Sequence, residues 1–203
     1  MFVPPTFAVA DEDAWDIVEA VGAGVMVRHG VSGLASVVVP FVVAEDRATL
    51  TTHVAKANDW WRDVADGDEV LVLFLAASGY VSPSYYPSRL TGRPHVPTWN
   101  YVATEVLGTV TLHHDRDWLV EQTGELTDHF EAVRTPPWSV AESSPEYLER
   151  QYGGIVGVTI AVTAVTGKKK LSQNRDEADR AFVRESLAQG RDNERAVATW
   201  MQP

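Results

Sequence analysis

The spacing of apolar residues along the chain predicts a mixture of short helices and longer strands. A helix buries one stripe of residues at a period of about 3.6, and four segments follow that pattern. Residues 115–133 give the clearest example, and Ser144 followed by Pro145 has the composition of a helix start. The predicted helices are 11–21, 115–133, a segment that starts at Ser144, and 176–189.

Runs rich in Val, Ile, Leu and Thr predict the strands. They are 24–28, 34–43, 48–52, 69–76 continued at 79–82, 100–113 and 154–166. Gly30–Gly33 is a predicted turn, and Pro40 indicates a sheet edge or a bulge. Residues 56–64 are read either as a short helix or as a loop. Residues 82–96 form a proline-rich loop of a length that is often functional.

Six or so strands interrupted by short helices predict a β-barrel-like α+β fold. The chain of 203 residues is long enough for one domain with a full core. We expect this single domain to span residues 1–190 and to be followed by a less ordered tail at 191–203.

Composition is that of a globular protein, with 45% hydrophobic and 22% charged residues. No apolar run reaches the ~18–20 residues of a membrane span. The first residues carry no basic stretch, so no signal peptide is predicted. Cysteine is absent, which excludes disulfides and fits a reducing compartment. These features predict a cytoplasmic protein without a membrane segment.

The net charge of −11 disfavours unaided binding to DNA, because Lys and Arg contacts to phosphate supply most non-specific affinity. The chain has 17 basic residues, and its one dense basic run is Lys168-Lys169-Lys170. A local positive site can still hold an anionic cofactor within an acidic protein.

Four short motifs combine cations, hydroxyls, amides and aromatic rings. In order they are His-Val-Ala-Lys-Ala-Asn-Asp-Trp-Trp at 53–61, Tyr-Val-Ser-Pro-Ser-Tyr-Tyr-Pro-Ser-Arg at 80–89, Val-Pro-Thr-Trp-Asn-Tyr at 96–101 and Lys-Leu-Ser-Gln-Asn-Arg at 170–175. Neither a core strand nor a surface helix requires such a mixture. Hydrogen-bond donors gathered with rings suit a planar heterocycle that carries an anion.

The first motif follows a strand end, where Thr51, Thr52 and His53 precede Lys56. A lysine ammonium suits a phosphate, and threonine hydroxyls add hydrogen bonds. From the residues alone, a solvated loop is the favoured alternative. In the second motif Tyr85 or Tyr86 could stack on a planar ring. A rigid proline turn with packed tyrosines explains that segment equally well.

In the third motif Trp99 alternates with Asn100 along a strand, so the ring and the amide face opposite sides. Core packing is the alternative for Trp99, whereas a buried Asn100 amide needs hydrogen-bond partners. The fourth motif lies between a strand and a helix, where backbone N–H groups and cations can bind an anion. Its alternative is a helix cap at Ser172 or Asn174.

Taken together and in this order, the motifs resemble the FMN-binding negative transcriptional regulator family, the PaiB-type proteins. The resemblance extends from Val3-Pro4 to Asp179-Arg180. The first motif is also similar to the phosphate segment of the wider FMN-binding split-barrel superfamily, which includes pyridoxamine phosphate oxidases. The chain departs from the family at Thr52, where Gly is usual, at Asp59, where Pro is usual, and at Tyr85, where Trp is usual.

This resemblance implies a split β-barrel with peripheral helices that binds FMN at the subunit interface of a homodimer. It implies a transcriptional regulator, with an FMN-dependent oxidoreductase acting on a small molecule as the alternative. A flavin-binding or haem-product-binding protein without turnover is a third alternative. A small-molecule effector or substrate is expected, and no catalytic residue is assigned. The predicted cofactor-binding residues are Thr51, Thr52, His53, Lys56, Asn58, Ser82, Ser84, Tyr86, Arg89, Thr98, Trp99, Asn100, Lys170, Ser172, Gln173, Asn174 and Arg175.

Other common site signatures are missing from the sequence. The six histidines offer no His-x-x-x-His pair with a nearby carboxylate, so no metal site is predicted. Nucleotide-binding glycine motifs and the Gly-x-Ser-x-Gly elbow of hydrolases are absent as well.

Overall fold

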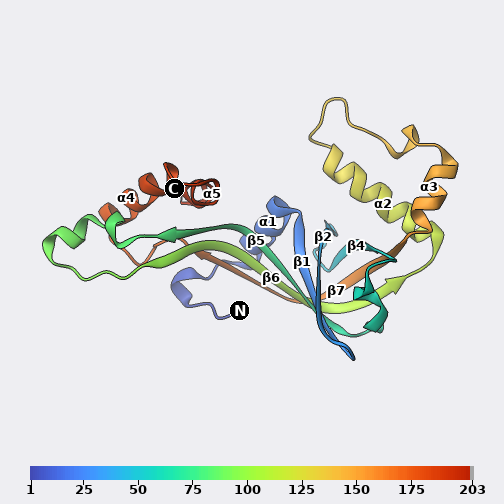
Figure 1. Ribbon diagram of the computed structural model, residues 1–203, viewed down its shortest axis with the longest axis horizontal. Helices are drawn as coiled ribbons and strands as arrows, with labels where there is room; N and C mark the ends of the chain where they lie inside the picture. The colour runs from blue at the N-terminus through green and yellow to red at the C-terminus, as the bar shows by residue number, and fades with distance from the viewer. Residues whose placement is uncertain (202–203) are drawn as a thin grey trace. The chain divides into compact units, whose positions relative to one another are not determined.

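The computed structural model describes residues 1–201 and has an α+β fold built on one sheet (Figure 1). The strands are β1 (Ala23–Gly30), β2 (Gly33–Pro40), β3 (Val42–Val43), β4 (Thr49–Ala55), β5 (Glu69–Val81), β6 (Thr98–His113) and β7 (Ile155–Lys170). They are hydrogen-bonded in the order β2-β1-β5-β6-β7-β4-β3. The pairings of β1 with β2 and β5, and of β4 with β3 and β7, are antiparallel.

The helices are α1 (Asp11–Val21), α2 (Arg116–Glu131), α3 (Pro145–Tyr152), α4 (Glu177–Ala188) and α5 (Asp192–Trp200). Short 3-10 helices are η1 (Pro5–Phe7), η2 (Asp59–Asp63), η3 (Pro83–Tyr85), η4 (Pro87–Thr91) and η5 (Val140–Glu142). Within residues 1–201, no helix combines the length and the apolar character needed to cross a membrane.

Contacts divide the chain into two compact units. The first unit comprises Met1–Val21, Phe74–Glu105 and Val165–Pro203, and the second comprises Gly22–Leu73 and Val106–Ala164. Strands β5, β6 and β7 contribute a segment to each unit. The first unit therefore carries three of the four sequence motifs, and the second unit carries the motif that starts at His53.

The four predicted helices are confirmed, with bounds that differ by a few residues. Residues 59–63 form η2, so the short helix was the correct alternative for that segment. The predicted strand 34–43 is divided into β2 and β3 at Phe41. The Phe41 N–H donates to Gly22 O at 2.9 Å, and its side chain is 2% exposed, so the chain leaves the β1–β2 ladder where it buries this ring.

The C-terminal segment was expected to be less ordered, and for residues 192–200 this expectation was wrong. Helix α5 buries Val197, Ala198 and Met201 in the core of the first unit. Its partners there include Val183 and Leu187 of α4. These apolar residues recur at helical spacing and give α5 a buried face. The segment is short and rich in charged residues, so its sequence does not indicate this face.

In the second unit, the alternation of side chains along β4 separates two faces. Leu50, Thr52 and Val54 are buried on one face. Register pairs Leu50 with Ile160 and Val54 with Val156 of β7. Thr51 and His53 lie on the opposite face, where His53 is hydrogen-bonded to a side chain of α2.

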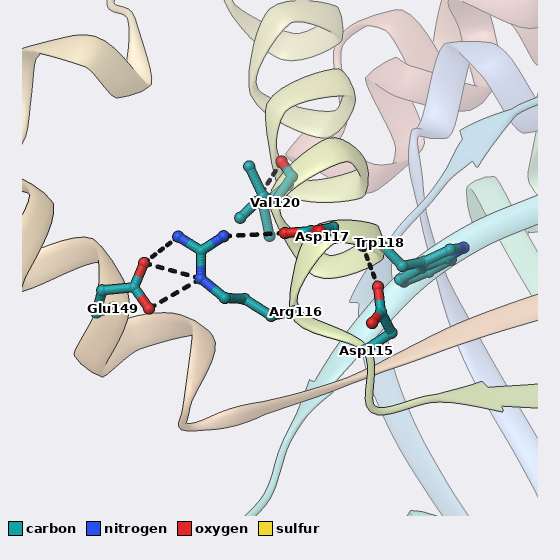
Figure 2. A network of polar contacts seen from close by, with 7 residues as sticks. Asp115, Arg116, Asp117, Trp118, Val120 and Glu149 are labelled. Carbon is teal, nitrogen blue, oxygen red and sulfur yellow. Dashed lines mark hydrogen bonds and ion pairs between the residues drawn. The ribbon is translucent and has the colours of Figure 1, made fainter.

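A polar network fixes the start of α2 and joins it to α3 (Figure 2). Asp115 Oδ1 accepts a hydrogen bond from Trp118 N at 3.0 Å and so caps the helix. Arg116 Nε donates to both carboxylate oxygens of Glu149 at 3.0 Å. These hydrogen bonds hold the pKa of Glu149 below its ordinary value. Because the pair is exposed, we expect it to orient α3 rather than to add much stability.

Trp118 of α2 packs directly on β7 in the second unit. Its ring is stacked on His113, with centroids 3.9 Å apart and planes at 6°. A Cβ added at Gly157 would lie 2.0 Å from Trp118 Cζ3. Glycine at this position therefore allows the indole to approach the strand.

We predict that Gly157→Ala lowers the free energy of unfolding by about 1–3 kcal/mol, because Trp118 must shift to admit the methyl group. Urea unfolding followed by circular dichroism measures the change. The control is Gly124→Ala in α2, where an added Cβ would meet nothing within 4 Å. That substitution should raise stability by roughly 0.5–1 kcal/mol through helix propensity. Equal effects of the two substitutions would contradict the packing argument.

The half-buried position of His113 predicts a dependence of stability on pH. Burial lowers the pKa of His113 from 6.5, with Asp66 opposing and His114 adding to the effect. The fold thus favours the neutral ring, whereas the unfolded chain takes up a proton as pH falls through about 6.5. Stability should therefore be complete above that pH and should decrease as pH falls toward the pKa of the folded state.

His113→Asn should flatten the fall in unfolding free energy between about pH 7 and 5, since Asn does not titrate there. The substitution also removes the contact between His113 Nε2 and Thr159 Oγ1, which are 2.9 Å apart, and this loss lowers stability at every pH without changing the slope. Urea titrations at several pH values give the slope, with the exposed His29→Asn as control. An unchanged slope in His113→Asn would show that another group carries the acid sensitivity.

Candidate functional site

The predicted cofactor-binding residues are divided between the two units. Five lie in the second unit, namely Thr51, Thr52, His53, Lys56 and Asn58. The other twelve lie in the first unit, in the loop after β5, at the start of β6 and at the end of β7.

A small cavity of about 50 Å³ in the first unit brings seven of the predicted residues together. It lies where the start of β6 meets the end of β7, which is its neighbour in the sheet. The turn after β7 and the segment between η3 and η4 complete the wall. The lining residues are Tyr86, Thr98, Asn100, Lys170, Ser172, Asn174 and Arg175.

A buried polar pair forms the floor of this cavity. Asn100 is 1% exposed and Ser172 is 4% exposed. Asn100 Nδ2 donates to Ser172 Oγ at 2.9 Å. Ser172 adopts a φ of 64°, the left-handed conformation that residues other than glycine seldom take. The hydrogen bond to Asn100 thus accompanies an unusual backbone turn at the end of β7.

Two cations enter the cavity without a carboxylate partner in the described part of the chain. Lys170 Nζ donates to Thr98 Oγ1 at 2.7 Å and also to Trp99 O. The guanidinium of Arg175 lies 4.9 Å from the centre of the Tyr86 ring. Burial lowers the pKa of Lys170, and the positive charges of Lys168 and Arg175 lower it further. A bound anion would relieve this repulsion.

Tyr86 is fully buried, and its hydroxyl is a buried polar atom without a hydrogen-bond partner among the described residues. Its ring is stacked on His95, with centroids 4.4 Å apart. A buried hydroxyl that lacks a partner is costly, so its position in the wall of the cavity suits a ligand that accepts or donates a hydrogen bond there.

Three residues outside the predicted cofactor-binding set, Ser88, His95 and Asp179, hold this loop in place. Ser88 Oγ lies 2.8 Å from His95 Nε2 and donates to Asp179 Oδ2 at 2.7 Å. Ser88 N also donates to Asp179 Oδ1 at 3.0 Å. Burial raises the pKa of Asp179, but the hydrogen bonds from Ser88 outweigh it and hold the pKa below its ordinary value. Figure 1 shows this loop beside α4, which carries Asp179.

Other predicted residues of the first unit make local contacts outside the cavity. Ser82 Oγ caps η3 by accepting from Ser84 N at 3.2 Å. Gln173 Oε1 accepts from Leu171 N at 2.7 Å and stabilises the turn after β7. Arg89 is exposed. Trp99 is 52% exposed and meets Tyr80 edge-on, so it is not a core residue.

In the second unit, His53 Nδ1 lies 2.9 Å from Gln122 Oε1 of α2. Thr52 is on the opposite face of β4 and is fully buried, with no partner for its hydroxyl among the described residues. Lys56 Nζ donates to Gly153 O at 2.9 Å, at the end of α3. Asn58 Oδ1 accepts from Trp60 N at 2.9 Å and caps η2.

The cavity of the first unit fits an anionic end of FMN by its donor set. Lys170 and Arg175 supply positive charge, and Thr98, Asn174 and the free Tyr86 hydroxyl supply uncharged hydrogen-bonding groups. Its volume of about 50 Å³ exceeds the ~30 Å³ share of one water molecule but cannot enclose a flavin ring. The cavity therefore suits one small polar group of the cofactor.

Comparison with known proteins supports a flavin-binding assignment. Residues 1–164 match the model of the family described as "Putative FMN-binding domain". The chain is 33% identical over 190 residues to the protease synthase and sporulation protein PAI 2 of Bacillus subtilis, covering 92% of this chain and 89% of that protein.

Solved structures share the fold at low sequence identity. The FAD and heme binding protein from Mycobacterium smegmatis gives a TM-score of 0.59 at 16% identity, over 90% of this chain and 79% of that one. A flavocytochrome from Azotobacter vinelandii gives 0.58 at 14% identity, over 87% of this chain and 75% of that one. These likenesses confirm the predicted split barrel.

The family model and the identity with PAI 2 together cover nearly the whole chain. The protein therefore belongs to the PaiB-type family of FMN-binding domains, and FMN is its cofactor.

Proposed function

We propose that this protein is a PaiB-type transcriptional regulator that acts as a homodimer, with FMN at the subunit interface. The observation that carries the proposal is the cavity of the first unit, where Lys170 and Arg175 converge on buried polar side chains. In this proposal those cations bind the FMN phosphate, and the other predicted residues of the first unit contact the cofactor. When bound, FMN supplies a ring that accepts and returns electrons.

The chain's charge shapes how such a regulator would act. With a net charge of −11, the protein repels duplex DNA over most of its surface. Of the dense basic run, Lys168 is buried and hydrogen-bonded to Phe2 O, and Lys170 lines the cavity. We propose that regulation depends on the flavin, on a small-molecule effector or on a partner protein rather than on direct DNA binding by this chain.

An FMN-dependent oxidoreductase is the second candidate. One protein of similar fold is named a flavocytochrome, and this name supports the oxidoreductase as an alternative. The two candidates differ in whether bound FMN turns over. Bleaching by a nicotinamide followed by reoxidation in air would support the enzyme, whereas a flavin that no donor reduces would support the regulator.

Removing the cavity lysine should weaken the binding of FMN more than the binding of riboflavin. In Lys170→Met, we expect the Kd for FMN to rise roughly 10- to 100-fold, since a charge-assisted contact to phosphate contributes about 1.5–3 kcal/mol. The Kd for riboflavin should change little, because riboflavin lacks the phosphate. Quenching of flavin fluorescence during titration measures both constants.

The matched control is Lys169→Met, the adjacent lysine of β7. Lys169 Nζ pairs with Asp13 at 3.3 Å and lies over the Trp200 ring, outside the cavity. Its substitution should leave both flavin constants unchanged. Equal loss of FMN and riboflavin affinity in Lys170→Met would remove the phosphate assignment, even if the protein still binds flavin.

Exposed apolar residues on the strands support the proposed homodimer. In the first unit Leu75 is 51% exposed and Trp99 is 52% exposed. In the second unit Leu34, Val38 and Leu107 are 75%, 69% and 40% exposed. Each of these exposed apolar side chains offers surface that a second copy of the chain could bury.

Light scattering at micromolar concentration should give twice the chain mass of 22.3 kDa. Leu107→Glu should shift the protein toward the monomer and weaken FMN, because a buried carboxylate without a partner disfavours association. Val133→Glu is the control, since Val133 is 86% exposed just beyond α2 and off the sheet. A monomeric wild type that binds FMN tightly would exclude the shared site.

A further inference from the structure

A second cavity lies in the second unit and is lined by residues of α2, α3 and the segment that connects them. Figure 1 shows the course of these elements. The cavity encloses about 250 Å³, five times the volume of the cavity in the first unit. That size is just below the ~300–1,000 Å³ of typical small-molecule sites. His53 of β4 and Ile155 of β7 line its inner side.

The walls of this cavity are apolar and aromatic. Thr123 Oγ1 donates to Leu119 O and Thr127 Oγ1 donates to Thr123 O, both at 2.7 Å. Their hydroxyls are thus used within α2, which leaves the methyl groups as the surface available to a ligand. Trp138 and Tyr147 add rings that are 43% and 46% exposed.

The aromatic wall is held in place before any ligand binds. Trp138 N donates to Glu131 Oε2 at 3.0 Å. Ser139 and Glu142 form a reciprocal capping box around η5, the next element after Trp138. Ser144 then caps α3, which carries Tyr147. A preformed site avoids the entropy of ordering a loop around its ligand.

The polar groups of the cavity specify the kind of ligand. No Asp, Glu, Lys or Arg lines it, so a charged ligand would be desolvated without a counter-charge. The side chains of Ser143 and Gln151 line it and carry a hydroxyl and an amide. They can therefore hydrogen-bond a polar substituent of the ligand.

His53 supplies the directional group. Its Nδ1 lies 2.9 Å from the amide oxygen of Gln122, a side chain that is only 2% exposed. In this orientation of the Gln122 amide its oxygen accepts from Nδ1–H, and a neutral imidazole then has Nε2 as its acceptor. Nε2 has no partner within the described chain, so it can accept a hydrogen bond from a ligand O–H or N–H group.

We propose that this cavity binds a small, uncharged aromatic molecule of one or two rings that carries an O–H or N–H donor. The aromatic walls stack on the rings, and His53 Nε2 accepts from the donor. Such a site gives the protein a place for an effector or a substrate in addition to its flavin. The inference rests on the second unit alone and does not depend on the phosphate assignment at Lys170.

Three probes of the same ring system test the proposal on the FMN-loaded protein by calorimetry. We expect 2-naphthol to bind with one molecule per chain. 2-Methoxynaphthalene, which lacks the donor, should bind roughly 3- to 10-fold more weakly, the usual effect of one neutral hydrogen bond. 2-Naphthalenesulfonate should bind at least about tenfold more weakly, because its charge has no counter-ion in the cavity.

Two variants locate the bound probe. Leu148→Trp fills the cavity, and Trp138→Ala removes one aromatic wall. Each substitution should weaken the binding of 2-naphthol at least about tenfold, while flavin fluorescence shows that FMN remains bound. Val133→Ala, an exposed residue near the same segment, should leave 2-naphthol binding unchanged.

Several results would overturn the proposal. One is the absence of 2-naphthol binding, and another is equal binding in wild type and both variants. A sulfonate that binds as well as the naphthol would exclude the uncharged class. Release of FMN by 2-naphthol would mean that the probe occupies the flavin site instead. Failure of FMN binding itself is seen separately in the flavin titration, so the two proposals can fail independently.

Discussion

The hydrogen bond between Asn100 and Ser172 is the contact on which the cavity of the first unit depends. Both side chains are almost fully buried, and a buried amide without a partner would be costly. Their pairing fixes the start of β6 against the turn after β7, where Ser172 takes a left-handed φ. Lys170 and Asn174 lie two residues to either side of Ser172, so the same contact aims both toward the cavity.

The positive charges of Lys170 and Arg175 in this cavity are not neutralised by a carboxylate of the described residues. Lys170 donates to a hydroxyl and to a carbonyl, and Arg175 lies against the Tyr86 ring, so neither has a carboxylate partner within residues 1–201. The lowered pKa of Lys170 expresses the same imbalance. The buried carboxylate of Asp179 is hydrogen-bonded by Ser88, which ties the loop after β5 to α4. The positive field is thus left available for an anion.

The second unit uses its polar residues differently. Alternation along β4 sends Thr52 into the core while Thr51 and His53 face α2. Gln122 then orients the imidazole through a single hydrogen bond. Lys56 caps the end of α3, so the segment that resembles a phosphate site also contributes to the structure of this unit. Within this segment, Thr52 and Lys56 therefore take part in the structure of the unit, whereas His53 lines a cavity.

Local patterns in the sequence determined most of the secondary structure. Helical periodicity, the Ser144-Pro145 start and the Gly30–Gly33 turn each depend on a few neighbouring residues, and all three are present. The resemblance carried by four ordered motifs likewise gave the family, the fold and the cofactor. Helix α5 was missed because its stability comes from burial against α4 and β5 rather than from its own composition.

Only the tertiary structure decided which polar residues meet. His95 and Asp179 belong to no motif, and Asp179 is 91 residues from Ser88 in the chain. The cavity between α2 and α3 joins His53 to Tyr147 and Gln151, which lie more than ninety positions later. Such groupings arise from long-range packing, and a sequence read through local spacing contains no signal for them. Residue types set what chemistry is available, whereas the fold decides which groups are close enough to share it.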